Sequence, residues 1–171
     1  MAANTEWLSD KDYKYVYNRT PRVCVDLLVF YKNKFLLIKR GIEPFIYHWA
    51  FPGGRVFHGE RIVNAIDRIV LKEVGVKCNN PEYFGFIEMP NDGKYIHTVS
   101  LVFLLNVISG KIKGDRNGGV IRAFDYVPDK MQPYQETFLK ENWGKIFNKV
   151  SFADLFTRKY EMLSNPKGKT S

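Results

Sequence analysis

Residues 54–76, with the sequence GRVFHGERIVNAIDRIVLKEVGV, carry the clearest structural signal in this chain. Apolar residues recur there every three or four positions between 60 and 74, at Ile62, Ala65, Ile66, Ile69, Val70 and Val74. This spacing predicts an amphipathic helix over 60–74 with one buried face. Gly75 follows the last apolar position, and glycine readily adopts the left-handed conformation that ends a helix.

Short apolar segments flank this helix, and turn residues separate them. We predict strands at 23–31, 35–39, 83–89, 97–107 and 121–127, a short extended piece at 48–51 and a tight turn at 52–54. Helical patterns at 9–17 and 135–163 bracket the strands, the second with an interruption near residue 150. Strands on both sides of one central helix, followed by a terminal helix, predict an α/β sandwich.

Length and composition predict one globular domain of ordinary size. The chain has 171 residues, of which 45% are hydrophobic and 26% are charged, as in typical globular proteins. No linker divides the sequence. We therefore treat 1–171 as a single domain, with an N-terminal helical extension at 1–20 and a C-terminal helical segment and tail at 135–171.

The net charge predicts an anionic partner. Lysine and arginine number 26 against 18 aspartate and glutamate residues, which gives a formal charge of +8. The basic residues are spread along the chain, and no zinc finger, RNA-binding motif or basic zipper accompanies them. The expected partner is therefore a small phosphate-bearing molecule rather than a nucleic acid.

Two further features favour a cytoplasmic protein without a membrane partner. The longest apolar run, 98–107, is about half the length that a membrane-spanning helix requires. The N-terminal residues are polar and acidic, unlike a secretory signal. Cys24 and Cys78 are too few for a disulfide scaffold and are expected to be reduced core residues.

The spacing of polar residues within the opening stretch indicates a specific chemistry. Gly54, Glu60, Arg68, Glu73 and Gly75 follow the pattern G-x5-E-x7-R-x4-E-x-G. This pattern resembles the Nudix box of the MutT-like hydrolases, and the approach WAFPGGR at 49–55 resembles the residues that precede that box. The resemblance implies a Nudix-type α/β/α sandwich with a mixed sheet and a magnesium-dependent hydrolase of nucleoside diphosphate derivatives.

The box departs from the full family pattern at two positions. The full box has glutamates at the positions of Ile69, Lys72 and Glu73, which cluster within about one helical turn. Isoleucine offers no oxygen to a metal, and lysine brings a positive charge to a place suited to a cation. The multi-metal mechanism of the ordinary family member therefore lacks two of its three carboxylates.

One Nudix subfamily, GDP-mannose mannosyl hydrolase, resembles this altered pattern. It keeps the last glutamate of the box, uses one magnesium ion and cleaves the bond between sugar C1 and oxygen. The similarity extends over roughly 8–127 and includes the segments 18–21, 25–27, 35–40 and 52–56. It implies a nucleotide-sugar substrate, Mg2+ with Mn2+ as a substitute, and a homodimer.

Carried over residue by residue, the resemblance assigns Asp26, Arg40, Arg55 and His97 to catalytic positions. Arg40 suits a phosphate or a base edge, or caps its strand on the surface. Asp26 lies in an apolar strand, where an unpaired carboxylate is costly. We expect it to have a buried partner such as His97 or an arginine.

The same resemblance assigns the metal to Glu73, to the main-chain carbonyl of Gly53 or Gly54, and to Asn117 in place of the family's glutamine. It makes Glu60 and Arg68 a structural pair.

Gly118 stands where the subfamily has its histidine base, so Asp115 or His97 would have to replace it. Two alternatives stay open for this reason. One is a Nudix pyrophosphohydrolase with metal ligands outside the box, and the other is an inactive nucleotide-binding module.

Overall fold

The computed structural model describes residues 8–79, 81–91, 96–113 and 119–164, with side chains described as far as residue 148. Its helices are α1 (Asp10–Tyr17), α2 (Ile62–Ile69) and α3 (Pro133–Ser164), and a π-helical turn, η1 (Val70–Val74), continues α2. The strands are β1 (Arg22–Tyr31), β2 (Lys34–Lys39), β3 (Trp49–Ala50), β4 (Gly53–Arg55), β5 (Val76–Cys78), β6 (Glu82–Met89), β7 (Thr98–Gly110) and β8 (Ile121–Phe124).

The strands form one mixed sheet around a parallel central pair. Strands β1 and β7 run parallel, in register from Arg22 opposite Thr98 to Phe30 opposite Asn106. The remaining pairings are antiparallel: β2 and β4 with β1, β3 and β8 with β2, and β5 and β6 with β7. This arrangement confirms the predicted mixed sheet.

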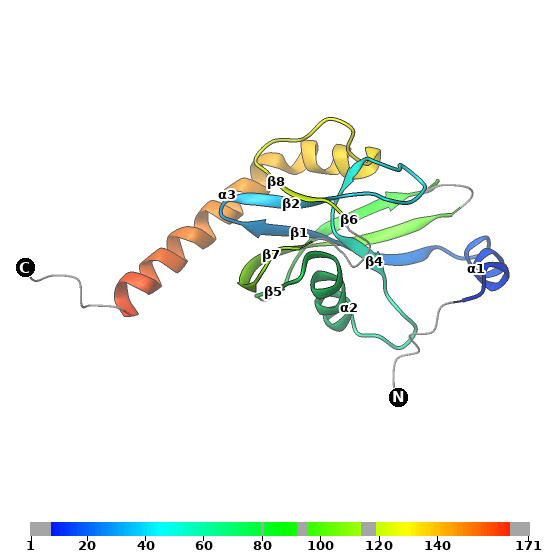
Figure 1. The fold of residues 1–171 in the computed structure, drawn as a ribbon, viewed down its shortest axis with the longest axis horizontal. Coiled ribbons are helices and arrows are strands. Elements are labelled where there is room, and N and C mark those ends of the chain that lie inside the picture. The colour runs from blue at the N-terminus through cyan, green and yellow to red at the C-terminus, as the bar shows by residue number, and fades with distance from the viewer. Residues whose placement is uncertain (1–7, 80, 92–95, 114–118, 165–171) are drawn as a thin grey trace, which may run out of the picture.

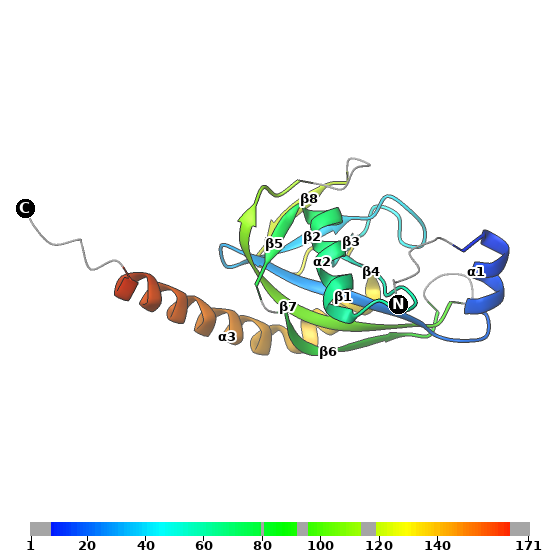
Figure 2. The same ribbon diagram turned by 90° about the horizontal axis from the view of Figure 1, so that it is seen from below.

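Each face of the sheet has its own hydrophobic cluster and its own helix (Figures 1 and 2). Apolar side chains alternate along β1, so Leu28 and Phe30 join the cluster under α3, whereas Val25, Leu27 and Val29 join the cluster under α2. Helix α3 contributes Leu139 and Ile146, both fully buried. Its later turns continue past the sheet (Figure 1). The three layers confirm the α/β/α sandwich.

The central helix begins at Ile62, two residues after the predicted start at 60, and changes geometry in its last turn. After Ile69 the chain widens into η1, where the Gly75 amide donates to the Val70 carbonyl at 3.0 Å. Gly75 has φ of 79°, which confirms its expected role as the end of the helix. A π-helical turn inside an α-helix often accompanies a functional site, and this one carries Glu73.

Two local predictions were wrong. Gly53 and Gly54 form no tight turn but are part of β4, because they pair with Asp26 and Val25 of β1. The terminal helix has no interruption near residue 150, and α3 is continuous from Pro133 to Ser164. The predicted helix at 9–17 is confirmed, with the Ser9 side chain capping the Asp12 amide at 3.2 Å.

The described residues bear on two expectations, one about membrane-spanning helices and one about the state of the cysteines. No helix among them is both long and apolar enough to cross a membrane. Both cysteines are free thiols, Cys24 buried and Cys78 half-buried. Burial raises the pKa of Cys78 to about 11, with a smaller contribution from the negative charge of Asp67.

Candidate active site at the β1–β4–η1 junction

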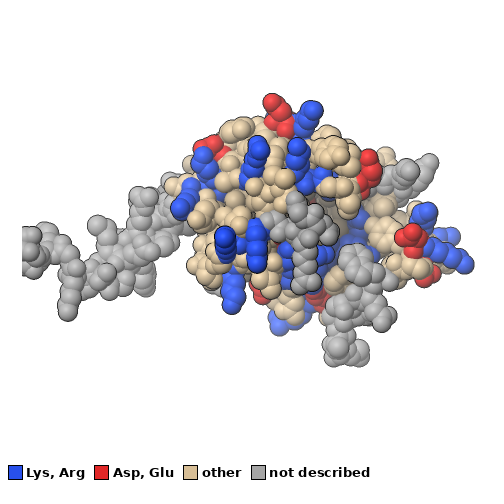
Figure 3. All heavy atoms as spheres, in the orientation of Figure 1, with Lys and Arg blue, Asp and Glu red and all other residues tan. Residues whose placement is uncertain are grey.

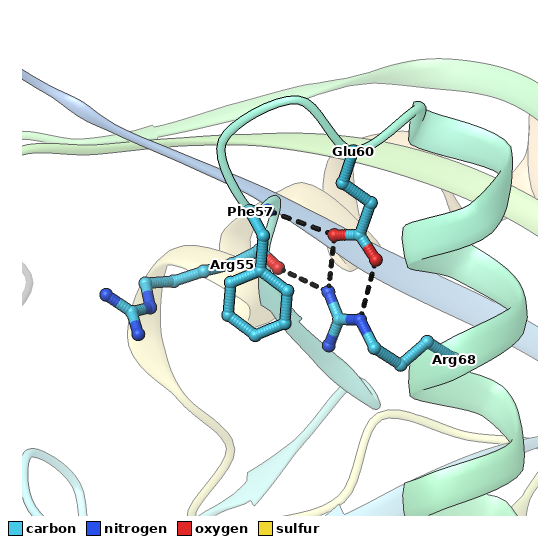
Figure 4. Close-up of polar contacts among 4 residues, drawn as sticks. All are labelled: Arg55, Phe57, Glu60 and Arg68. Carbon is cyan, nitrogen blue, oxygen red and sulfur yellow. Dashed lines mark hydrogen bonds and ion pairs between the residues drawn. The ribbon is translucent and has the colours of Figure 1, made fainter. Parts of the chain in front are cut away.

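A bidentate ion pair shapes the loop that leads into α2 (Figure 4). The Arg68 guanidinium donates from Nε to Glu60 Oε1 at 2.7 Å and from Nη2 to Glu60 Oε2 at 2.8 Å. The amide of Phe57 donates to the same carboxylate at 3.0 Å. The Arg68 hydrogen bond lowers the pKa of Glu60, assisted by the Phe57 amide and the Arg68 charge and opposed by burial.

Arg68 also connects this loop to β4, the strand that contains the two glycines. Its Nη2 donates to the Arg55 carbonyl at 2.8 Å, and its guanidinium lies 4.1 Å from the centre of the Phe57 ring. The loop from 55 to 60 is therefore attached to α2 by one arginine (Figure 4). This geometry is that of a structural ion pair, because the carboxylate of Glu60 and the guanidinium of Arg68 bind one another.

Gly53 lies between two carboxylates from different elements. Its amide donates to Glu73 Oε2 at 3.0 Å, so η1 is joined directly to β4. On its other side, a Cβ at residue 53 would overlap Asp26 Oδ1 and would lie 2.8 Å from the Val25 carbonyl. Only glycine allows this approach. The close contact brings Glu73 and Asp26, two residues predicted for the site, to the same backbone position.

Asp26 has a buried amide as its partner. Its side chain is 6% exposed, and Gln135 at the start of α3 donates from Nε2 to Asp26 Oδ2 at 3.0 Å. His97, one of the partners expected from sequence, does not take this place. Gln135 was missed because no spacing relates a residue in the terminal helix to one in the first strand. Its only sequence signal was its position at the start of that helix.

The two altered box positions have different environments. Ile69 is 1% exposed and belongs to the cluster under α2, where its Cδ1 lies 3.4 Å from the place of a Cβ on Gly54. Lys72 is exposed. Neither position offers an oxygen, so the carboxylates of the full box are replaced here by core packing and by a surface charge.

The residues present fit one hard divalent cation and do not fit the full multi-metal set. Among the described residues, no group of three or more His, Cys, Asp or Glu side chains could hold a metal ion. Glu73 and the main chain of Gly53 are already in contact. A carboxylate, a carbonyl and the oxygens of a bound diphosphate are the ligand types that Mg2+ prefers.

The two arginines predicted for catalysis have different surroundings. The Arg55 guanidinium is surrounded by aromatic rings, 5.3 Å from the centre of Tyr13, 5.9 Å from Tyr17 and 5.8 Å from Phe57. Its side chain points away from the Glu60–Arg68 pair (Figure 4). Arg40 follows β2 and donates from Nε to the Pro44 carbonyl at 2.7 Å, so the loop after β2 folds around it.

His97 is placed at the edge of this arrangement. It comes directly before β7 and accepts the Arg22 amide with its carbonyl at 2.8 Å, whereas Asp26 pairs with Val102 further along the same two strands. Its Nε2 lies 3.2 Å from Glu88 Oε1 but is not aligned for a hydrogen bond. The structure therefore does not bring His97 to Asp26. Asn117, Gly118 and Asp115 lie outside the described residues.

The sandwich, the box and the paired Glu60 and Arg68 together define a Nudix domain. Comparison with protein families agrees, because the NUDIX domain model matches residues 20–143. The chain belongs to this family.

The individual proteins to which this chain is similar have several different names. The chain is 35% identical over 112 residues to an ADP-ribose pyrophosphatase of Methanocaldococcus jannaschii, a match that covers 66% of each chain, just under two thirds. It is 25% identical over 141 residues to the low-salt glycan biosynthesis protein Agl8 of Haloferax volcanii, covering 79% of this chain and 90% of that protein. Among solved structures, a MutT NUDIX hydrolase from Burkholderia pseudomallei superposes with a TM-score of 0.63 at 23% identity, covering 68% of this chain and 95% of that one.

Proposed function

We propose that this protein hydrolyses a nucleoside diphosphate linked to a sugar, with one divalent cation. The observation that carries the proposal is the contact between Glu73 and Gly53, in a box whose Ile69 position is core. Glu73 and the carbonyl of Gly53 or Gly54 would hold Mg2+, or Mn2+ as a substitute. Asn117 stays a predicted further ligand. The bound cation would neutralise the charge that develops on the diphosphate leaving group.

The protein's own groups divide the remaining work. Arg55 directly follows the two glycines, and its guanidinium is the candidate for a contact with a phosphate oxygen. Arg40 is the second candidate for a phosphate or base contact. Asp26 supports β4 through its close approach to Gly53. Water attacks C1 of the sugar, the C1–oxygen bond breaks, and the products are the free sugar and a nucleoside diphosphate.

The surface charge supports an anionic substrate. Lysine and arginine side chains predominate over acidic ones on the face shown in Figure 3, in agreement with the formal charge of +8. Such a surface attracts multiply charged phosphates and raises their local concentration. This supports the substrate class and leaves the base and the sugar open.

A second candidate function keeps the substrate class and changes the bond. The relative that is 35% identical is named ADP-ribose pyrophosphatase, which favours cleavage of the pyrophosphate link. That reaction would yield a nucleoside monophosphate and a sugar phosphate. Such a reaction requires metal ligands beyond those of the altered box.

Product analysis separates the two reactions. We would incubate the protein with ADP-ribose, GDP-mannose and other nucleotide sugars, with and without Mg2+, and separate the products by ion-exchange chromatography. Free sugar with a nucleoside diphosphate supports attack at C1, and a nucleoside monophosphate supports the second candidate. No product from any compound, with thermal stabilisation by one of them, would indicate the inactive binding module instead.

The metal assignment has its own test. Glu73→Gln removes the carboxylate charge and is expected to reduce the Mg2+-dependent rate at least about 100-fold, as is typical when a transition-state charge contact is lost. Asp67→Asn, the same kind of change at an exposed site on α2, is the matched control and should retain the wild-type rate. Equal rates for Glu73→Gln and wild type would refute the metal assignment.

The homodimer also remains a proposal. Tyr83 and Phe86 are 53% and 58% exposed on β6, and among the described strands β6 pairs only with β7. An open strand edge with exposed aromatic residues is a feature of association surfaces. Light scattering across a range of protein concentrations tests it, and a constant monomer mass would contradict it.

A further inference from the structure

A buried amide network joins helix α3 to β1 and to the segment that leads into β4. Gln135, 5% exposed, donates from Nε2 to Asp26 Oδ2 at 3.0 Å. Its Oε1 accepts the Phe51 amide at 2.8 Å. One side chain therefore bridges β1 and the segment between β3 and β4.

The orientation of this amide is determined by its surroundings. The Phe51 amide can only donate, so the oxygen of Gln135 must face it and the NH2 group must face Asp26. The backbone of Gln135 is held in addition, since its amide donates to Gln132 Oε1 at 2.7 Å. Gln132 is 2% exposed and caps the first turn of α3. Neither the side chain nor the helix end is free to turn.

The segment that Gln135 supports is the one that meets Glu73. Leu27 donates to the Pro52 carbonyl at 2.9 Å, Asp26 abuts Gly53, and Gly53 donates to Glu73 at 3.0 Å. A Cβ at residue 53 would overlap Asp26 Oδ1, so the place of the Gly53 backbone is coupled to that of the Asp26 side chain. The main-chain carbonyl proposed to bind the metal belongs to β4. The direction in which that carbonyl points therefore depends on the same contacts.

We infer that Gln135 is a positioning residue, which acts through Asp26 to hold the Gly53 backbone in the orientation that the divalent cation requires. This inference rests on the proposed function for the metal and adds to it a residue from the terminal helix. Residues that orient metal ligands from outside typically change metal affinity or activity by about 10- to 100-fold when they are replaced.

The main test variant is Gln135→Glu. It keeps an oxygen for the Phe51 amide but places an acceptor against Asp26. The control is Asn142→Asp, the same amide-to-carboxylate change further along α3, where the side chain donates to the Phe138 carbonyl at 2.9 Å. Mn2+ affinity is measured by electron paramagnetic resonance on the free protein, and kcat and KM are measured on whichever nucleotide sugar is turned over.

We expect Gln135→Glu to weaken Mn2+ binding at least about tenfold. We expect kcat to fall by a similar factor, with KM for the nucleotide within twofold. Asn142→Asp should stay within twofold of wild type in all three quantities. Equal Mn2+ affinities in the two variants would overturn the inference.

A double-mutant cycle separates positioning from general stability. In Asp26→Asn/Gln135→Glu the hydrogen bond reverses, because the asparagine can donate to the glutamate. The Gln135→Glu loss should therefore disappear in the Asp26→Asn background, in both Mn2+ affinity and melting temperature. An equal loss in both backgrounds would mean that Gln135 acts independently of Asp26. If Gln135→Glu does not fold, Gln135→Met, which removes both the donor to Asp26 and the acceptor of the Phe51 amide without adding charge, is measured with the same expected loss of affinity.

The failure of the proposed function is distinguishable from the failure of this inference. A wild-type protein that binds no Mn2+ would refute the single-cation proposal and, with it, the inference. A wild-type protein that binds Mn2+ as tightly as Gln135→Glu does would refute the inference alone.

Discussion

Replacing Glu60 by glutamine removes the charge that Arg68 binds, and the structure allows the cost to be worked out. The carboxylate is 6% exposed and accepts two hydrogen bonds from Arg68 and one from the Phe57 amide. Breaking a fully buried pair costs about 3–5 kcal/mol. Arg68 is 29% exposed, so water replaces part of the loss. We expect a decrease of about 2 kcal/mol in the free energy of unfolding at pH 7.

For a domain of this length, 2 kcal/mol corresponds to a decrease of about 4–8 °C in the melting temperature. Calorimetry or urea denaturation measures it. Glu88→Gln is the matched control, since Glu88 is 57% exposed and exposed ion pairs contribute about 0–1 kcal/mol. Arg68→Lys keeps the charge but loses the fork, and should fall between the control and Glu60→Gln.

The pH dependence of this difference has a defined sign. The pKa of Glu60 is lowered from its usual 4.5, so the native state favours the ionised form. The stabilisation is complete above pH 4.5 and is lost as the pH falls through the lowered folded pKa. Wild type and Glu60→Gln should therefore differ most at neutral pH and converge in acid. Equal stabilities at pH 7, or a difference that grows in acid, would refute the reasoning.

Three further predictions follow from packing. Gly53→Ala should lower the free energy of unfolding by about 1–3 kcal/mol in urea denaturation, because its Cβ would lie 2.8 Å from a backbone oxygen. The control is Gly54→Ala, whose Cβ would meet only the Ile69 side chain, at 3.4 Å or more, and it should cost less than half as much. With a pKa of about 11, Cys78 should react with Ellman's reagent at pH 8 more than about 100-fold more slowly in the folded than in the unfolded protein, and equal rates would contradict this. Leu139→Ala should cost about 2–5 kcal/mol, since Leu139 is fully buried under the sheet, and a cost below 1 kcal/mol would show that α3 is not packed as described.

Residue spacing alone was enough to predict the class of fold and the framework of the box. Helix periodicity at 60–74 and the alternation along β1 are local properties, because burial of one helix face or one strand face follows from residue spacing. The pairing of Glu60 with Arg68 was expected from the box pattern. The spacing also showed that Ile69 and Lys72 offer no carboxylate, which narrows the proposed chemistry to one cation.

The contacts around Gly53, by contrast, depend on how distant elements pack against one another. The strand pairing of Gly53 and Gly54 with β1, in place of the predicted turn, depends on hydrogen bonds to residues 25 and 26, far away in the chain. The widening of α2 into η1 and the partnership of Asp26 with Gln135 likewise arise from contacts between distant elements. Residue spacing along the chain does not predict such contacts. A buried polar group takes as its partner whichever donor the packed elements bring next to it.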